Sequence, residues 1–70
     1  MIVRKYPTEA SYREAIRTRI TEPAERSGWL PEQITKRFVV RQLTISMGTY
    51  RDRNKNFGIS HEDIQSLRIR

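Results

Sequence analysis

The 70-residue sequence contains no cysteine and only one histidine, His61. Without cysteine, the chain can form neither a disulfide framework nor a thiolate zinc site. One histidine cannot furnish a metal site alone, and the sequence holds no phosphate-binding glycine loop and no Ser/His/Asp set of the kind that nucleophilic catalysis needs. We therefore expect no metal, no cofactor and no enzymatic activity, and we expect His61 to be a solvated surface residue.

Long hydrophobic runs are also missing. No apolar run of signal-peptide length follows the first residues, and no later segment approaches the length of a membrane span, so we expect a cytoplasmic protein. Hydrophobic residues make up only 36% of the chain, which is a small supply for the core of one 70-residue domain. Because no disulfide or metal supplements that core, we expect a single domain, residues 1–70, that is stabilised as a homodimer or by a bound partner.

Acidic residues are the scarcer charged class. Eight Asp and Glu stand against 14 Lys and Arg, which leaves a net charge of +6, and most of the basic residues are arginine. Arginine binds phosphate through two parallel hydrogen bonds and stacks on bases. The composition therefore favours a polyanionic partner, with nucleic acid ahead of an acidic protein surface.

Residues 21–38 predict two short helices separated by a tight break. Thr21 can cap the first helix, whose first turn tolerates Pro23, and Gly28 ends this helix. Pro31 is predicted to begin the second helix, because a proline at this position gives up an amide that has no partner inside a helix.

The spacing of Ala24, Gly28 and Ile34 resembles the signature of small helix-turn-helix DNA-binding regulators. In this signature a small residue lets two helices approach, a glycine takes up the left-handed turn conformation, and an aliphatic residue packs the second helix onto the first. The sequence departs from the signature at Arg37, where a further aliphatic residue is usual. The resemblance implies a DNA-binding regulator, although a purely structural helical corner would produce the same spacing.

The same spacing recurs twice further along the chain. Residues 43–46 followed by Tyr50, and residues 57–60 followed by Ile64, repeat the intervals of the first corner. Three such corners predict an all-α fold, a small bundle of four to five short helices with a helix-turn-helix corner. The alternation of apolar and polar residues over about 38–47 leaves open an α+β fold with a strand there.

Helix caps mark two further elements. Thr8 is predicted to cap a helix that runs to about Ile20, and Ser60 is predicted to cap a short helix near the end of the chain. Residues 1–7 are expected to form either a flexible basic arm, a short edge strand or a frayed terminus.

Two segments carry side chains suited to DNA. In the helix predicted after Gly28, a glutamine can hydrogen-bond to an adenine edge while basic residues bind phosphates. The segment after Thr44, residues 46–56, is more basic and forms either a recognition helix or a basic loop that contacts phosphates. Because buried spacing fixes helix geometry, whereas surface charge can serve as non-specific anchoring, we predict that the Gly28 corner reads the DNA. The candidate nucleic-acid-binding residues are Gln33, Lys36, Arg37 and Arg41 after the first corner, and Thr49, Arg51, Arg53, Asn54 and Lys55 after the second.

The function predicted from these features is that of a helix-turn-helix DNA-binding protein acting as a transcriptional or DNA-processing regulator. Its size and basicity resemble those of proteins of bacteriophage or plasmid origin. Two alternatives stay open. One is a small phage-encoded inhibitor that docks on an acidic surface of a host or defence protein, such as an anti-CRISPR or polymerase-binding factor. The other is an RNA-binding protein that uses residues 51–56 and Tyr50.

Overall fold

The structure, a computed structural model, describes residues 5–69 of the chain. All regular secondary structure in this range is helical, which confirms the predicted all-α fold. The elements are α1 (Glu9–Ile16), a π-helical turn (Arg17–Thr21), α2 (Glu22–Ser27), a 3-10 turn (Pro31–Gln33), α3 (Lys36–Leu43), α4 (Met47–Phe57) and α5 (His61–Gln65). The strand considered for residues 38–47 is not formed, because this segment divides between α3, a turn and the start of α4.

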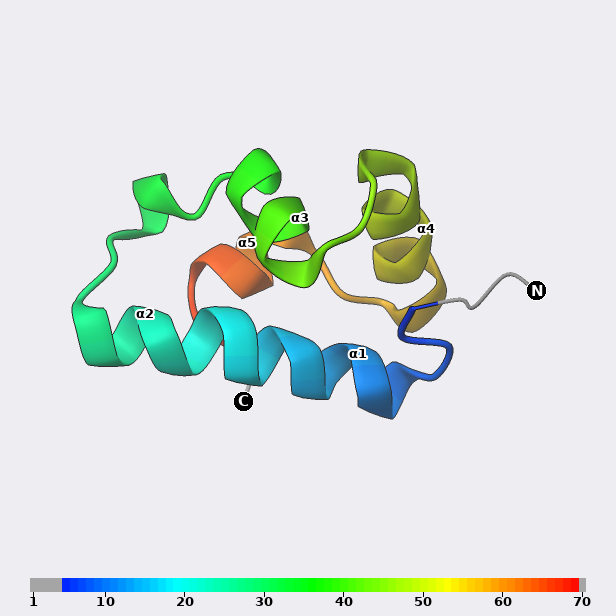
Figure 1. The fold of residues 1–70 in the computed structure, drawn as a ribbon, viewed down its shortest axis with the longest axis horizontal. Helices are drawn as coiled ribbons and strands as arrows, with labels where there is room; N and C mark the ends of the chain where they lie inside the picture. Colours follow the sequence, from blue (N-terminus) through cyan, green and yellow to red (C-terminus); the bar gives the residue numbers. More distant parts are fainter. Residues whose placement is uncertain (1–4, 70) are drawn as a thin grey trace.

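The helix α1, the π turn and α2 form one continuous rod along one side of the molecule, with α3, α4 and α5 on the other side (Figure 1). Thr8 caps this rod as predicted, because its Oγ1 accepts a hydrogen bond from the N–H of Ser11 at 3.1 Å. Tyr12, Ile16 and Ile20 repeat at helical spacing and are 0% exposed. The rod therefore supplies one whole wall of the core.

The continuity of the rod corrects the predicted helix break at Thr21. Pro23 has no N–H, and its ring would crowd the carbonyl of Arg19 in a regular α-helix. The π turn just before it widens the hydrogen-bonded loop, since the N–H of Glu22 donates to the carbonyl of Arg17 five residues back. The rod thus continues past the proline, and Thr21 lies inside it without capping anything.

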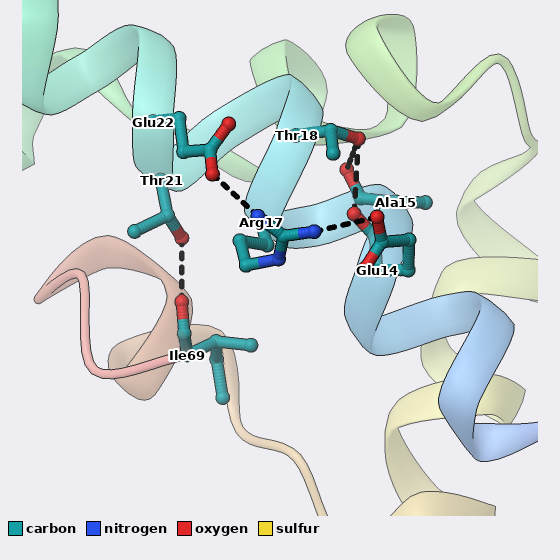
Figure 2. Close-up of polar contacts among 7 residues, drawn as sticks. All are labelled: Glu14, Ala15, Arg17, Thr18, Thr21, Glu22 and Ile69. Atoms are coloured by element: carbon teal, nitrogen blue, oxygen red, sulfur yellow. Dashed lines mark hydrogen bonds and ion pairs between the residues drawn. The ribbon is translucent and has the colours of Figure 1, made fainter.

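The π turn is held from outside by an ion-pair cluster and from inside by a buried hydroxyl (Figure 2). The guanidinium of Arg17 bridges the carboxylates of Glu14 at 2.6 Å and Glu22 at 2.5 Å. Hydrogen bonding to Arg17 lowers the pKa of the Glu14 carboxyl below its ordinary value. The hydroxyl of Thr21, which is 0% exposed, donates to the carbonyl of Ile69 at 2.8 Å. This bond ties the end of the chain to the middle of the rod.

The Gly28 corner differs from its prediction in its second half. Gly28 ends α2 in the left-handed conformation, with φ of 72°, as expected. The helix predicted to begin at Pro31 is not formed, because the chain makes only a single 3-10 turn over Pro31–Gln33. Thr35 is the next residue able to cap a helix, and α3 begins after it, at Lys36.

The core draws on every helix of the described chain. The residues of the first corner that match the helix-turn-helix spacing, Ala24 and Ile34, are both buried in it. Its buried hydrophobic members are Tyr12, Ala15, Ile16, Ile20, Ala24, Ile34, Val39, Leu43, Tyr50, Ile59, Ile64 and Ile69.

The arm predicted for residues 1–7 lies partly outside the described residues, which begin at Lys5. In the part that is described, the hydroxyl of Tyr6 donates to the carbonyl of Leu43 at 2.9 Å, and its ring packs against Tyr12. Residues 5 and 6 are therefore attached to the core.

Candidate nucleic-acid interface

The turn between α3 and α4 is three residues long. Thr44 ends α3 in the left-handed conformation, with φ of 58°, and Ile45 packs half-buried against the core. Ser46 caps α4, because its Oγ accepts a backbone N–H of the first turn at 3.1 Å. Tyr50 is buried at the position predicted to pack the second helix onto the first. The structure therefore has, at Thr44, two helices joined by a short turn, with Tyr50 buried as the predicted spacing requires.

One face of α4 is turned to solvent. It begins at Gly48, which has no side chain, and continues at helical spacing through Arg51 to Lys55. The Arg51 side chain is 82% exposed, and its ion pair with Asp52 is long, at 4.0 Å, so it contributes little stability. The exposed residues of α4 are Met47, Gly48, Arg51, Asp52, Lys55 and Asn56. Met47 and Gly48 were not predicted from the sequence, because neither side chain is a typical DNA contact. Their position at the start of the second helix is the feature that could have identified them.

Arg53, a predicted phosphate contact, faces the interior instead. It is only 6% exposed, and its Nε and Nη2 donate to the carbonyl of Lys5 at 3.4 and 3.3 Å. The physical reason is its spacing, since Arg53 lies three residues after the buried Tyr50 and shares the inner face of α4. The predicted phosphate role is therefore corrected to a structural one.

Asn54 and Thr49, both predicted to hydrogen-bond to bases or phosphates, are half-buried and engaged within the fold. The hydroxyl of Tyr12 donates to Oδ1 of Asn54, and a hydrogen bond from the Asn54 side chain to Tyr50 partly opposes the effect of burial on the Tyr50 pKa. The Oγ1 of Thr49 accepts from the Ser46 hydroxyl at 3.0 Å. Burial raises the pKa of Tyr12 and of Tyr50 above their ordinary value, so both hydroxyls stay protonated and able to donate.

The residues predicted around the Gly28 corner are divided by the structure. Gln33 lies in the 3-10 turn, where its Oε1 accepts the N–H of Leu30 at 2.7 Å. It is therefore not part of an α-helix that could serve as a recognition helix. Lys36, Arg37 and Arg41 are exposed on α3. Of these residues only Lys36 lines a groove together with residues of α4, while Arg37 and Arg41 are exposed elsewhere on α3.

A shallow groove of about 410 Å³ runs beside the first half of α4. It combines apolar side chains with two cations, Lys36 from α3 and Arg51 from α4, and no carboxylate lines it. Its lining residues are Lys36, Met47, Gly48, Tyr50, Arg51, Asn54, Ile59, Ser60 and His61.

His61 in this groove is not the solvated residue expected from the sequence. Its Nδ1 lies 2.6 Å from the hydroxyl of Tyr50, and the two rings meet edge to face with centroids 5.9 Å apart. Burial lowers the pKa of His61 below its ordinary 6.5, the Lys36 ammonium lowers it further, and a hydrogen bond with the Ile34 backbone opposes the shift. The sequence places His61 eleven residues after Tyr50 in another helix, and spacing within a helix does not reveal such a contact.

Other classes of site find no support within residues 5–69. No group of three His, Asp or Glu side chains there is arranged to hold a metal ion. No helix in the same range has the length and apolar character needed to cross a membrane. Comparisons with protein-family models, curated proteins and solved structures give no significant match to this chain.

Proposed function

We propose that this protein binds duplex DNA through the helix-turn-helix corner of α3 and α4, acting as a transcriptional or DNA-processing regulator with α4 as its recognition helix. In this motif the second helix enters the major groove and its first residues contact base edges, while the first helix crosses the backbone. The observation that carries the proposal is a short turn that joins two helices, the second of which has an exposed basic face.

The distribution of charge supports this choice of surface. Residues 9–27, the rod, carry four arginines and four glutamates, and Arg13 and Arg17 pair with glutamates of the same rod. Residues 36–57, which hold α3 and α4, carry six basic residues against one acidic residue. The rod is thus balanced, and the corner holds a local excess of positive charge that favours a polyanion.

The exposed face of α4 is suited to close approach to the major groove of DNA. Gly48 lets the helix backbone come near the DNA because no side chain stands between them, and Arg51 lies one turn further along the same face. In this proposal Arg37 and Arg41, which are exposed on α3, bind DNA phosphates beside the major groove. Arg51, in place of Gln33, is the residue expected to contact the DNA.

We propose that the protein acts as a homodimer, since two copies double the contacts of a short recognition helix. Among residues 5–69, the large hydrophobic side chain with the greatest exposed fraction is Leu30, at 54%. It follows Trp29, whose half-buried ring packs edge to face on Phe38 with centroids 4.9 Å apart. This apolar surface is where a second copy would be expected to bury area.

Salt dependence and one matched pair of variants test the proposal. Affinity for a random-sequence duplex, measured by fluorescence anisotropy, should fall with salt along a log–log slope of about −4 to −6. Arg51→Ala should either flatten this slope by about one unit, as a phosphate contact, or reduce sequence preference by about 1–3 kcal/mol at one base pair. Arg26→Ala is the control, because it removes the same charge from an exposed position in α2, at the opposite end of the molecule from α4 (Figure 1).

Two results would contradict the proposal. A slope near zero, or no binding at low salt, would remove DNA as the partner. Equal losses of affinity in Arg51→Ala and Arg26→Ala would mean that binding depends on net charge alone and that α4 makes no specific contact with the DNA. Gln33→Ala should leave sequence preference unchanged, because Gln33 lies outside the helices of the corner.

A further inference from the structure

The groove beside α4 has an interior suited to an anionic ligand with an apolar portion. Three separate elements supply its basic side chains: Lys36 from α3, Arg51 from α4 and His61 from α5. Met47 and Ile59 supply the apolar part of the lining. A cavity of about 410 Å³ that combines an apolar lining with a few convergent polar groups has the usual size and character of a small-ligand site.

Charge decides the class of ligand. The lining contains two permanent cations and no carboxylate, so no negative side chain inside the groove neutralises them. Arg51 forms a long ion pair with Asp52, at 4.0 Å, and this carboxylate lies outside the groove. An anion with several acceptor oxygens would satisfy both cations at once.

We propose that this groove binds a phosphate group, held between Lys36 and Arg51 with His61 beside it. The phosphate is supplied either by the DNA backbone, in which case the inference rests on the proposed function, or by a free phosphate ester. In both cases phosphate oxygens contact the same side chains. The experiment therefore asks first whether the groove binds a phosphate, and then which molecule supplies that phosphate.

Binding at this position is linked to the protonation of His61. The groups that face its ring are the Lys36 ammonium, the Tyr50 hydroxyl and the backbone of Ile34, with Arg51 across the groove. Because folding lowers the pKa of His61, the unliganded protein loses stability as the pH falls through the ordinary value of 6.5. A bound phosphate offsets the Lys36 charge and raises this pKa, so affinity for the phosphate should increase as the pH falls.

The single histidine of the chain makes the experiment direct, because its imidazole signals in an NMR pH titration report only on this groove. The two probes are diethyl phosphate, whose single negative charge does not change across the titration, and a short random-sequence duplex. We expect at least one probe to raise the pKa of His61 by about 0.5 unit, which corresponds to about threefold tighter binding to the protonated form. A rise with diethyl phosphate shows that the site binds an isolated phosphate diester without the rest of the duplex, and a rise with the duplex alone identifies a backbone phosphate.

Charge-removing variants decide whether the groove is responsible. Lys36→Gln should abolish the rise caused by the probe, whereas Arg26→Gln, an exposed position at the far end of the molecule, should leave it intact. Melting curves of both variants confirm that they fold. Equal effects of the two substitutions, or no rise with either probe, would overturn the phosphate site.

The two proposals fail in different ways. If anisotropy shows duplex binding while neither probe changes the His61 titration, the groove is not a phosphate site and the proposed function stands. If the duplex does not bind but diethyl phosphate raises the pKa of His61 in the wild type and not in Lys36→Gln, the phosphate site stands and the proposed function fails.

Discussion

The Gly28 and Thr44 corners begin alike and end differently. Each ends a helix in the left-handed conformation, with φ of 72° and 58°. After Thr44, α4 begins within three residues, whereas after Gly28 the chain makes a single 3-10 turn and α3 starts only at Lys36. The corner with the better turn residue, Gly28, is therefore not the one in which a second helix follows directly.

The two corners differ in the residue that lies two positions after the turn residue. Ser46 stands there in the Thr44 corner, and its hydroxyl accepts a backbone N–H from the first turn of α4. Leu30 stands there in the Gly28 corner and offers no acceptor, so only Gln33 reaches back, to the Leu30 N–H. The first N–H groups of a helix have no partner within it, and a capping oxygen satisfies one of them. The cap, more than the turn, decides whether a second helix follows.

The corner at Gly58 tests whether the turn residue or the capping residue decides that a second helix follows. Gly58 has the same left-handed conformation as Gly28, with φ of 67°, but Ser60 follows two residues later and caps α5. A helix therefore begins promptly after either a glycine or a threonine, provided that a serine cap comes next. This agrees with the preference of helix starts for Ser, Thr, Asp and Asn.

The largest difference between the corners should appear when the leucine of each is shortened. Leu43 is 0% exposed and Leu30 is 54% exposed. Leu43→Ala should lower the free energy of unfolding by about 2–5 kcal/mol, and Leu30→Ala should lower that of the monomer by less than about 0.5 kcal/mol. Urea denaturation followed by Trp29 fluorescence measures both.

The same pair tests the proposed homodimer. If Leu30 is covered by a second copy in solution, Leu30→Ala should remove the dependence of the melting temperature on protein concentration. A wild-type melting temperature that does not change with concentration would argue against the dimer.

Removing the cap should have a smaller effect confined to the Thr44 corner. Ser46→Ala should cost about 1 kcal/mol, because one N–H of the first turn of α4 loses its acceptor. Ser60→Ala should cost a similar amount at α5, while Ser27→Ala, at the exposed end of α2, should be close to neutral. Thermal unfolding followed by circular dichroism measures all three. A neutral Ser46→Ala would mean that tertiary packing, and not the cap, fixes the start of α4.

Exchanging the turn residues should give effects no larger than those of the caps, and of opposite sign. Thr44→Gly should stabilise the protein by about 0.5 kcal/mol, because a β-branched residue is strained at positive φ and glycine is not. Gly28→Ala should destabilise it by about 1 kcal/mol for the same reason, since a Cβ there meets no atom within 4 Å and only the backbone conformation opposes it. Melting temperatures should shift by roughly 4–8 °C per kcal/mol. Destabilisation by Thr44→Gly would show that the Thr44 side chain is needed at the turn.

The candidate site was only partly predictable from the sequence. The spacing around Thr44 and Tyr50 predicted the corner, and the basic composition of residues 46–56 pointed to its second helix. Arg53 could have been excluded by the same periodicity, because it shares a helix face with Tyr50. The sequence prediction favoured the Gly28 corner because it gave buried spacing more weight than surface charge.

The sequence by itself determined the features that depend on neighbouring residues: the cap at Thr8, the left-handed turn at Gly28 and the short final helix after Ser60. Tertiary structure alone decided which side chains are exposed, because burial depends on contacts between segments far apart in the chain. Arg53 bonds to the carbonyl of Lys5, and Thr21 to the carbonyl of Ile69, each across 48 residues. Local periodicity specifies the faces of a helix, but which face meets the core is settled only when these distant segments pack together.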